Sequence, residues 1–495
     1  MNTRQQSQPE STNKPRETGT GHDWLIGIGG CGMSGLATLL QQGGRLCSGS
    51  DGQAGPVTRR LTENGIHVHH ASDCSVELPE QVDRVIHSAA IPEDHPELIQ
   101  ARDRGLQVIS YAEALGLTQA AHTGVSIAGT HGKSTTTAML AHVLIECGLD
   151  PSFIVGAHCE QIGGGSRCGA MRIPGDGPYG DQPGILLAEA CEFNRSFHHH
   201  RPVLGLINNI EEDHLDLYGS LDEIVKAFAQ FARNLPPEES GGRLLIAHEG
   251  AHRREVTAGI DAPSMTFGYN PSADYQVFQD VAASRAGILQ DGVWLCQWSL
   301  SMPGEHNTLN AAAAAILASW LGADWDRIAT ALAGFRGLDR RMQRLGTRSL
   351  RNGGRVVLYD DYGHHPTECE KTLKALRQAE EPGRIICVFQ PHQHSRTRFL
   401  LDEFATSFSN ADVVIVPDIY FVRDSEIEKQ RISASDLVDR LRDKGMMAMH
   451  LYPFEAIVEQ LEIMCTDGDL VVIMGAGPVW QIANRFMEAE PGRDA

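Results

Sequence analysis

Short apolar runs alternate with amphipathic, helix-like segments along nearly the whole chain. Most of these runs are continuously apolar, which is typical of parallel strands that are covered on both faces of a sheet. Strands that alternate with helices indicate an α/β fold. The clearest predicted strands are Trp24–Ile28, Arg84–His87, Val125–Ala128, Ile185–Ala188, Val203–Ile207, Arg243–Ala247, Arg355–Tyr359, Arg384–Phe389, Val413–Val416 and Leu470–Met474.

Changes in this pattern divide the chain into three predicted units behind a polar segment. Residues 1–21 have no apolar run, so we expect a disordered tail rather than a signal peptide. The predicted units are residues 22–122, 123–333 and 334–495. We also predict helices at Leu309–Leu321 and Pro366–Arg377, a Gly- and Pro-rich loop at Gly163–Pro183, and irregular β structure with glycine turns at Met265–Trp298.

Composition narrows the class of protein. The 495 residues carry a formal net charge of −21, so a nucleic-acid partner is not expected. The 11 cysteines form no CxxC pair, which favours reduced thiols in a cytoplasmic protein over a zinc site. No stretch of about 18 uncharged apolar residues occurs, and we therefore expect no membrane partner.

A glycine-rich loop follows the first predicted strand. Gly27, Gly29 and Gly32 have the spacing G-x-G-x-x-G, and Ser50-Asp51 lie about twenty residues further on. Such a loop brings backbone close to a pyrophosphate at a helix N-terminus. The same pattern can be a simple packing turn, and the diphosphate can belong to a UDP-sugar as well as to NAD.

A second glycine loop follows the strand Val125–Ala128. Gly129-Thr130-His131-Gly132-Lys133-Ser134-Thr135 lies between this strand and a helical pattern, which is the arrangement of a P-loop. Lys133 is expected to reach the β/γ-phosphates and Ser134 to ligate Mg²⁺. Ile127 stands where the strict motif has glycine, so the loop is shorter.

Acidic residues and histidines follow the next predicted strands. Glu189 and Glu192 come after one strand, and Asp213-His214 come after another. In parallel α/β sheets the carboxyl edge of the strands is where ligands bind, so these side chains are candidates for a metal site. Each of them alone is also compatible with a solvated loop. The run His198–His200 is predicted to be surface.

Six motifs in order resemble the Mur ligase family. They are GIGGCGMSG (27–35), GTHGKSTTTA (129–138), NNIEEDHLDLYG (208–219), GEHNTLNAAAA (304–314), DDYGHHPTE (360–368) and FQPHQHSRTR (389–398). The resemblance spans roughly residues 22–487. It implies a Rossmann-like N-terminal domain, a P-loop-type central ATPase domain with a mostly parallel sheet, and a Rossmann-like C-terminal domain.

The family joins a carboxylic acid to an amino acid while ATP is converted to ADP and phosphate, and an acyl phosphate is the intermediate. The resemblance implies ATP and Mg²⁺ as cofactors. Motifs beside the amino-acid site point to UDP-N-acetylmuramate and L-alanine as the small-molecule substrates, in peptidoglycan precursor synthesis. The oligomeric state cannot be read from the sequence.

The resemblance also implies a role for individual residues. For catalysis these are Lys133, His364 and Arg396; for the metal they are Ser134, Glu189 and His214. The amino acid is expected at Tyr362, His364 and Arg396. The expected UDP-sugar residues are Gly27, Gly29, Gly30, Gly32, Ser50, Asp51 and Ser88. The expected ATP residues are Gly129, Thr130, His131, Gly132, Lys133, Ser134, Thr135, Asn307, Arg341, Asp360 and Asp361.

Departures from the family pattern keep alternatives open. AEACEF (188–193) replaces AEADES, and Gln393 stands where a common pattern has Arg. Lys226 is the nearest candidate for the carbamylated lysine of some relatives. GLDRRMQ (337–343) resembles a related ligase that adds a recycled tripeptide to UDP-N-acetylmuramate. A nicotinamide oxidoreductase and a catalytically dead regulatory protein are the alternatives from other classes.

Overall fold

The computed structural model describes residues 21–70, 76–351, 353–422 and 424–488. The tail predicted at residues 1–21 lies outside the described residues except for Gly21. Contacts between residues divide the chain into a unit that ends at Ala121 and a unit that begins at His122. The three domain ranges expected from the sequence stay predictions. Among the described residues, no helix is both long and apolar enough to cross a membrane.

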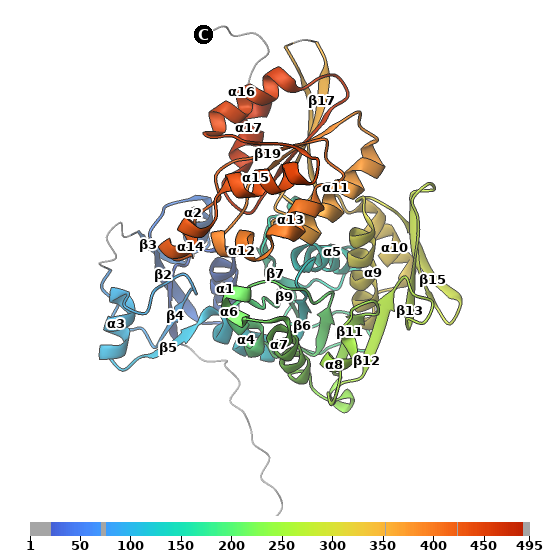
Figure 1. The fold of residues 1–495 in the computed structure, drawn as a ribbon. Coiled ribbons are helices and arrows are strands. Elements are labelled where there is room, and N and C mark those ends of the chain that lie inside the picture. The colour runs from blue at the N-terminus through green and yellow to red at the C-terminus, as the bar shows by residue number, and fades with distance from the viewer. Residues whose placement is uncertain (1–20, 71–75, 352, 423, 489–495) are drawn as a thin grey trace, which may run out of the picture. The chain divides into compact units, whose positions relative to one another are not determined.

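The first unit is one parallel sheet of five strands in the order β3-β2-β1-β4-β5 (Figure 1). This is the strand order of a dinucleotide-binding domain, with its switch point between β1 and β4. Its strands are β1 (His22–Ile26), β2 (Leu46–Asp51), β3 (His67–His70), β4 (Arg84–His87) and β5 (Gln107–Ser110). Its helices are α1 (Cys31–Gln42), α2 (Pro56–Glu63), α3 (Pro96–Asp103) and α4 (Tyr111–Ala120).

The second unit begins with a ten-stranded sheet in the order β15-β14-β13-β12-β11-β10-β6-β9-β7-β8. The strands are β6 (Thr123–Ala128), β7 (Ser152–Ile154), β8 (Ser166–Arg167), β9 (Ile185–Glu189), β10 (Leu204–Ile207), β11 (Arg243–Ala247), β12 (Ser264–Gly268), β13 (Tyr275–Asp280), β14 (Arg285–Gln290) and β15 (Val293–Ser299). The helices are α5 (Lys133–Glu146), α6 (Leu215–Tyr218), α7 (Leu221–Arg233), α8 (Arg253–Val256), α9 (Glu305–Trp320) and α10 (Trp325–Gly334).

Helices cover both faces of this sheet around its central strand β6. On one face α5, α9 and α10 pack together over Val125 and Ile127, and Figure 1 shows α5 beside α9. On the other face Phe228 and Phe231 of α7 pack against Ala128. Because β6, β9, β10 and β11 are buried from both sides, their sequences are continuously apolar.

The same unit ends with a six-stranded sheet in the order β16-β17-β21-β18-β19-β20, in which β16 alone is antiparallel. Its strands are β16 (Gln343–Ser349), β17 (Arg355–Asp361), β18 (Ile385–Phe389), β19 (Val413–Val416), β20 (Met447–His450) and β21 (Leu470–Met474). Its helices are α11 (Pro366–Glu380), α12 (His394–Phe399), α13 (Leu401–Ser407), α14 (Glu426–Arg431), α15 (Ala434–Asp443), α16 (Phe454–Met464) and α17 (Trp480–Glu488).

The α/β architecture predicted from the apolar runs is confirmed. Met265–Trp298 is β structure with a glycine turn, as predicted, but it is more ordered than expected: β13, β14 and β15 form an antiparallel meander with one register shift, between Ile288 and Leu289. Asp291 and Gly292, both at positive φ, make the two-residue turn between β14 and β15. An Asp-Gly pair is a strong sequence signal for such a turn, in agreement with the glycine turns predicted for this segment.

Candidate active site

The phosphate loop connects β6 to α5, and its backbone requires glycine at two points. Gly132 has φ 82°, and a Cβ there would lie 2.5 Å from Asn310 Oδ1. Gly129 has φ 138°, and a Cβ there would lie 3.0 Å from the Cβ of Asn208. The loop therefore packs tightly on the neighbouring strand end, and the N-terminus of α5 is left with the N–H groups and dipole that favour phosphate.

Lys133 folds over this loop. Its Nζ donates to the carbonyl oxygens of Gly129 (2.6 Å) and Thr130 (3.0 Å) and lies 2.9 Å from Glu192 Oε2. Burial alone would lower the pKa of Lys133, but the charge and hydrogen bond of Glu192, together with Cys191 and Glu189, outweigh burial and raise the pKa. Lys133 is therefore a firmly charged ammonium group at the N-terminus of the helix.

Oxygen donors gather beside Lys133. Ser134 Oγ donates to Glu189 Oε2 at 3.0 Å, which brings two of the predicted metal residues together. The third, His214, lies instead beside Asp213 (3.6 Å) and Glu192 (4.0 Å), and these three side chains could hold a cation between them. Carboxylate and hydroxyl oxygens suit Mg²⁺, so the donor set fits the ion that the family implies.

His214 is held in an uncommon conformation. Its φ of 52° is in the left-handed region, and its Nδ1 is buried without a hydrogen-bond partner among the described residues. Its backbone N–H donates to Asp213 Oδ1 at 2.7 Å. A non-glycine residue in this region costs free energy, and such residues cluster at functional sites. The strain supports the assignment of His214 to the site.

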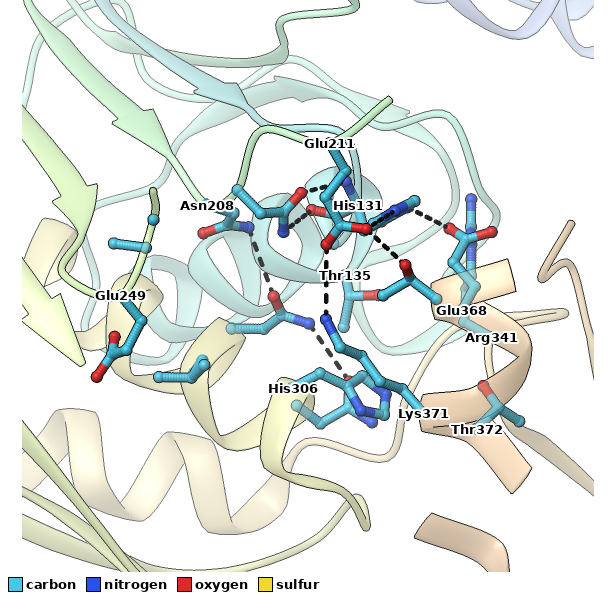
Figure 2. Close-up of a pocket in the computed structure, with 18 of the residues that line it drawn as sticks. His131, Thr135, Asn208, Glu211, Glu249, His306, Arg341, Glu368, Lys371 and Thr372 are labelled. Carbon is cyan, nitrogen blue, oxygen red and sulfur yellow. Dashed lines mark hydrogen bonds and ion pairs between the residues drawn. The ribbon is translucent and has the colours of Figure 1, made fainter. Parts of the chain in front are cut away.

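A cavity of about 360 Å³ opens next to the phosphate loop (Figure 2). Six of the predicted ATP residues line it: His131, Gly132, Thr135, Asn307, Arg341 and Asp361. The other predicted ATP residues, Gly129, Thr130, Lys133, Ser134 and Asp360, are not among its lining residues. The wall also includes residues that the sequence reading did not select: Asn208, Glu211, Glu249, His306, Glu368, Lys371 and Thr372. Several of these lie inside the family motifs, which is where a signal for them was present.

Asp361 lies at the end of β17 in the six-stranded sheet and holds residues on this side of the cavity. Asp361 Oδ2 accepts hydrogen bonds from the Met342 backbone N–H (3.1 Å) and Thr372 Oγ1 (3.0 Å). Its neighbour Asp360 instead lies 3.3 Å from Arg340, and burial raises the pKa of Asp360 to about 6. Asp361 therefore faces the cavity, whereas Asp360 is occupied by an ion pair.

Asn307 lies on α9 and is buried. Its Nδ2 donates to the carbonyl oxygen of Pro303 at 2.8 Å, and its Oδ1 accepts from Asn310 Nδ2 at 3.4 Å. Nδ2 also donates to Met342 Sδ at 3.5 Å, so the amide is fixed in one orientation and only the remaining acceptor capacity of Oδ1 is left for the cavity. The predicted contact of Asn307 with ATP stays a prediction.

His131 bridges two carboxylates across the cavity. Its Nδ1 lies 3.1 Å from Glu368 Oε1 on α11, and its Nε2 lies 3.4 Å from Glu211 Oε2 in the loop after β10 (Figure 2). Burial alone would lower the pKa of His131, but Glu368 and Glu211 outweigh it and raise the pKa to about 9. The phosphate loop is thereby tied to the C-terminal sheet by a charged imidazolium.

This ion-pair bridge predicts a pH dependence of stability. Because the folded pKa of His131 exceeds the unfolded value of about 6.5, its stabilisation is complete below pH 6.5 and disappears as the pH rises through 9. Wild type should melt on the order of 3 °C above His131→Asn at pH 6, and the two should converge by pH 10. Thermal melts of both proteins across this range check the prediction; a difference that does not change with pH contradicts it.

The predicted amino-acid residues come together at the end of β17 and the start of α12. The rings of Tyr362 and His364 are 5.4 Å apart, and the ring of His392 is 5.9 Å from that of His364. Arg396 Nη1 lies 3.2 Å from His392 Nδ1. Arg341 lies over the Tyr362 ring at 4.7 Å, so this group adjoins the cavity. His392 links the predicted residues although it was not selected as one.

Arg396 also reaches the central sheet. Its Nε and Nη2 both donate to Asp213 Oδ1, at 3.0 and 2.9 Å, and both side chains are buried. Burial would raise the pKa of Asp213, but Arg396, together with His214, His364 and His365, holds this pKa well below its usual range. The amino-acid group is thus joined to the candidate metal group by one buried ion pair.

The glycine loop of the first unit connects β1 to α1. Gly27 has φ 76°, and its N–H donates to the Ser50 carbonyl oxygen at 2.8 Å. Asp51 Oδ2 accepts from the Gly29 N–H at 2.8 Å. The Ser50 hydroxyl donates to the buried Glu97 at 2.7 Å, so it is occupied within the unit. Two further expected residues lie at the start of α1: Gly30 is its N-cap and Gly32 is its second residue. The last, Ser88, lies beside the loop, because a Cβ added at Gly27 would be 3.3 Å from the Cβ of Ser88.

Nucleotide choice at this loop can be tested in the full chain. We expect UDP-N-acetylmuramate to bind far more tightly than NADH, and Asp51→Ala to weaken the UDP-sugar roughly tenfold because the loop loses its carboxylate partner. ATP binding should not change, since its residues lie in the second unit. Equilibrium titrations with each ligand check this, and tighter binding of NADH would support the oxidoreductase alternative instead.

Three other sequence expectations can be placed. The run His198–His200 is not surface, because His200 is 2% exposed and lies 2.8 Å from Ser126 Oγ, while His198 stacks on Phe197. Adjacent histidines point in different directions, and only His199 is exposed. Lys226 is exposed and pairs with Glu223 at 2.7 Å on α7. Gln393 is buried and caps α12 with φ 71°.

Comparison with known proteins gives matches along most of the chain. Family models match residues 25–123 (Mur ligase family, catalytic domain), 127–318 (Mur ligase middle domain) and 340–477 (Mur ligase, glutamate ligase domain). A UDP-N-acetylmuramate–L-alanine ligase from Pelotomaculum thermopropionicum is 38% identical over 468 residues, which are 93% of this chain and 95% of that protein.

Solved structures are also similar. The UDP-N-acetylmuramate-alanine ligase of Thermotoga maritima has a TM-score of 0.73 and 26% identity over 94% of this chain and 98% of that chain. A UDP-N-acetylmuramate:L-alanyl-γ-D-glutamyl-meso-diaminopimelate ligase from Neisseria meningitides has a TM-score of 0.57 and 28% identity, over 64% of this chain and 98% of that chain.

Proposed function

The chain belongs to the Mur ligase family, and we propose that it joins the amino group of L-alanine to the carboxylate of UDP-N-acetylmuramate while ATP is converted to ADP and phosphate. One observation carries this proposal. The phosphate loop follows a strand of the ten-stranded sheet, and the predicted amino-acid residues follow strands of the six-stranded sheet. The two groups meet at one site through the pairs His131–Glu368 and Asp213–Arg396. A site of this kind can hold a phosphoryl donor and an amine acceptor together.

The chemistry requires two successive displacements. A carboxylate is a poor electrophile, so one of its oxygens first attacks the γ-phosphorus of ATP, and ADP leaves. The amine nitrogen of L-alanine then attacks the carbonyl carbon of the acyl phosphate. Phosphate leaves with the electron pair of the broken C–O bond, and the nitrogen loses a proton.

Residues of the central sheet act on the phosphoryl group. Lys133 is charged and lies at the N-terminus of α5, so it can neutralise the charge that develops on the transferring phosphoryl oxygens. We propose that Ser134, Glu189 and His214 hold Mg²⁺, with Glu192 and Asp213 close by. When bound, the ion would supply further charge neutralisation at the phosphate oxygens.

Residues of the C-terminal sheet receive the acceptor. Burial lowers the pKa of His364 to about 4, so its ring is neutral at pH 7. Its Nδ1 lies 3.1 Å from the Tyr362 carbonyl oxygen, which assigns the proton to Nδ1 and leaves Nε2 as an acceptor for the substrate ammonium group. Arg396 supplies a fixed cation for a carboxylate or phosphate oxygen. Closure of both sheets around the site would exclude water from the acyl phosphate.

Phosphate release tests this function directly. UDP-N-acetylmuramate, ATP and Mg²⁺ are supplied with L-alanine, glycine, L-serine or the tripeptide of the rival ligase. We expect kcat/KM for L-alanine to exceed that for the tripeptide at least about tenfold, whereas glycine and L-serine compete better because small pockets discriminate weakly by size. A preference for the tripeptide would move the chain to the rival activity. We also propose that the reaction takes place in the cytoplasm.

A further inference from the structure

We propose that Glu368 is a positioning residue that couples acceptor binding to nucleotide binding, because its two carboxylate oxygens hold the amino-acid loop and the phosphate loop at the same time. This inference rests on the proposed function. It concerns how the two halves of the site communicate, and Glu368 itself touches neither reacting group.

One oxygen of Glu368 fixes the amino-acid loop. Oε2 accepts hydrogen bonds from the backbone N–H groups of His364 (2.9 Å) and His365 (3.2 Å). This contact is a capping box, since His365 is the N-cap of α11 and Glu368 is its third residue. A purely structural role for Glu368 would be satisfied by this oxygen alone.

The other oxygen of Glu368 has no part in the cap. Oε1 lies 3.1 Å from Nδ1 of His131, in the middle of the phosphate loop (Figure 2). The carboxylate is 16% exposed, and the His131 side chain is 10% exposed, so little water competes for either group. A charge-assisted hydrogen bond between largely buried partners is strong and directional.

A movement of one loop therefore displaces the other loop. The Tyr362–His365 backbone cannot shift without moving Oε2, and the rigid carboxylate then moves Oε1 against His131. Binding of an amino acid at His364 would select one position of Glu368, and hence one position of the phosphate loop. Coupling of this kind is reciprocal, so nucleotide binding must favour the acceptor by the same factor.

The measurement is the Kd of a non-hydrolysable ATP analogue with UDP-N-acetylmuramate present, determined with and without L-alanine. The coupling factor is the ratio of the two Kd values. We expect wild type to show a ratio of about fivefold or more, within the usual range for coupled sites. Glu368→Gln should reduce the ratio to about one but lower the melting temperature by no more than the roughly 3 °C expected for His131→Asn, because the amide oxygen can still cap α11.

A double-mutant cycle shows whether the effect passes through His131. His131→Asn alone and combined with Glu368→Gln should both give a ratio near one, with no further loss in the double variant. Glu305→Gln is the matched control, since Glu305 also joins α9 to α11 through Lys374 (3.4 Å) but lies outside the cavity wall. It should keep the wild-type ratio. Glu368→Asp replaces Glu368→Gln if the latter does not fold. Aspartate keeps the charge, but its side chain is too short to contact both loops, so this variant should also lower the ratio.

Retention of the wild-type ratio by Glu368→Gln, or by Glu368→Asp in its place, overturns the inference. So does retention by His131→Asn, or a wild type that makes product from L-alanine but has a ratio of one. A wild type that makes no product from L-alanine overturns the proposed function instead, and phosphate release therefore separates the two failures.

Discussion

Lys133→Ala should lower the rate of phosphate release at least about a hundredfold. Nζ of Lys133 is held at the N-terminus of α5 by two loop carbonyls and Glu192, and no second lysine or arginine shares these partners among the described residues. Removal of one preorganised electrostatic partner of a transition state costs about a hundredfold or more. Steady-state turnover at saturating ATP and UDP-N-acetylmuramate measures the loss.

Stability must be followed in the same variant, because Glu192 is 3% exposed and would lose its cation. Activity is therefore compared at a temperature well below the melting point of both proteins. Lys374→Ala is the control, since the ion pair of this α11 lysine with Glu305 is exposed and its loss should leave turnover unchanged. Turnover above about a tenth of wild type in Lys133→Ala would show that the loop does not act on phosphate.

His214→Ala should raise the Mg²⁺ concentration needed for half-maximal activity by roughly ten- to a hundredfold, and should lower turnover as well. Even residues around metal ligands typically change metal affinity by this factor when they are removed. His214 faces two carboxylates and has a strained backbone conformation. A bound cation accounts for both features. Mg²⁺ titrations of phosphate release give both quantities.

The control for this variant is His199→Ala, which removes the exposed member of the neighbouring histidine run. Its Mg²⁺ titration should overlay that of wild type. If His214→Ala gives the same titration as wild type, the metal assignment fails, although the phosphate loop could still be correct.

Local sequence signals are sufficient where a structural feature depends on neighbours in sequence. Gly129, Gly132 and Lys133 lie in one turn between a strand and a helix, and backbone sterics alone demand glycine there. The parallel strands of the central sheet were equally readable, because burial on both faces leaves an unbroken apolar run.

Contacts between distant segments could not be read in this way. Arg396 and Asp213 are 183 residues apart, and only the packing of α12 against the loop before α6 brings them together. Ser50 shows the same limit on a smaller scale: its hydroxyl is occupied by Glu97 of α3, which no motif around the glycine loop indicates. Which acid pairs with which base depends on tertiary packing.

The most direct test uses UDP-N-acetylmuramate labelled with ¹⁸O in its carboxylate, ATP, and equal concentrations of L-alanine and the tripeptide. Mass spectrometry is used to weigh both the nucleotide-sugar product and the released phosphate. We predict a product that is heavier by one alanine residue, with one ¹⁸O transferred to each phosphate as the acyl phosphate is displaced. Unlabelled phosphate, or a product that carries the tripeptide, would contradict the account.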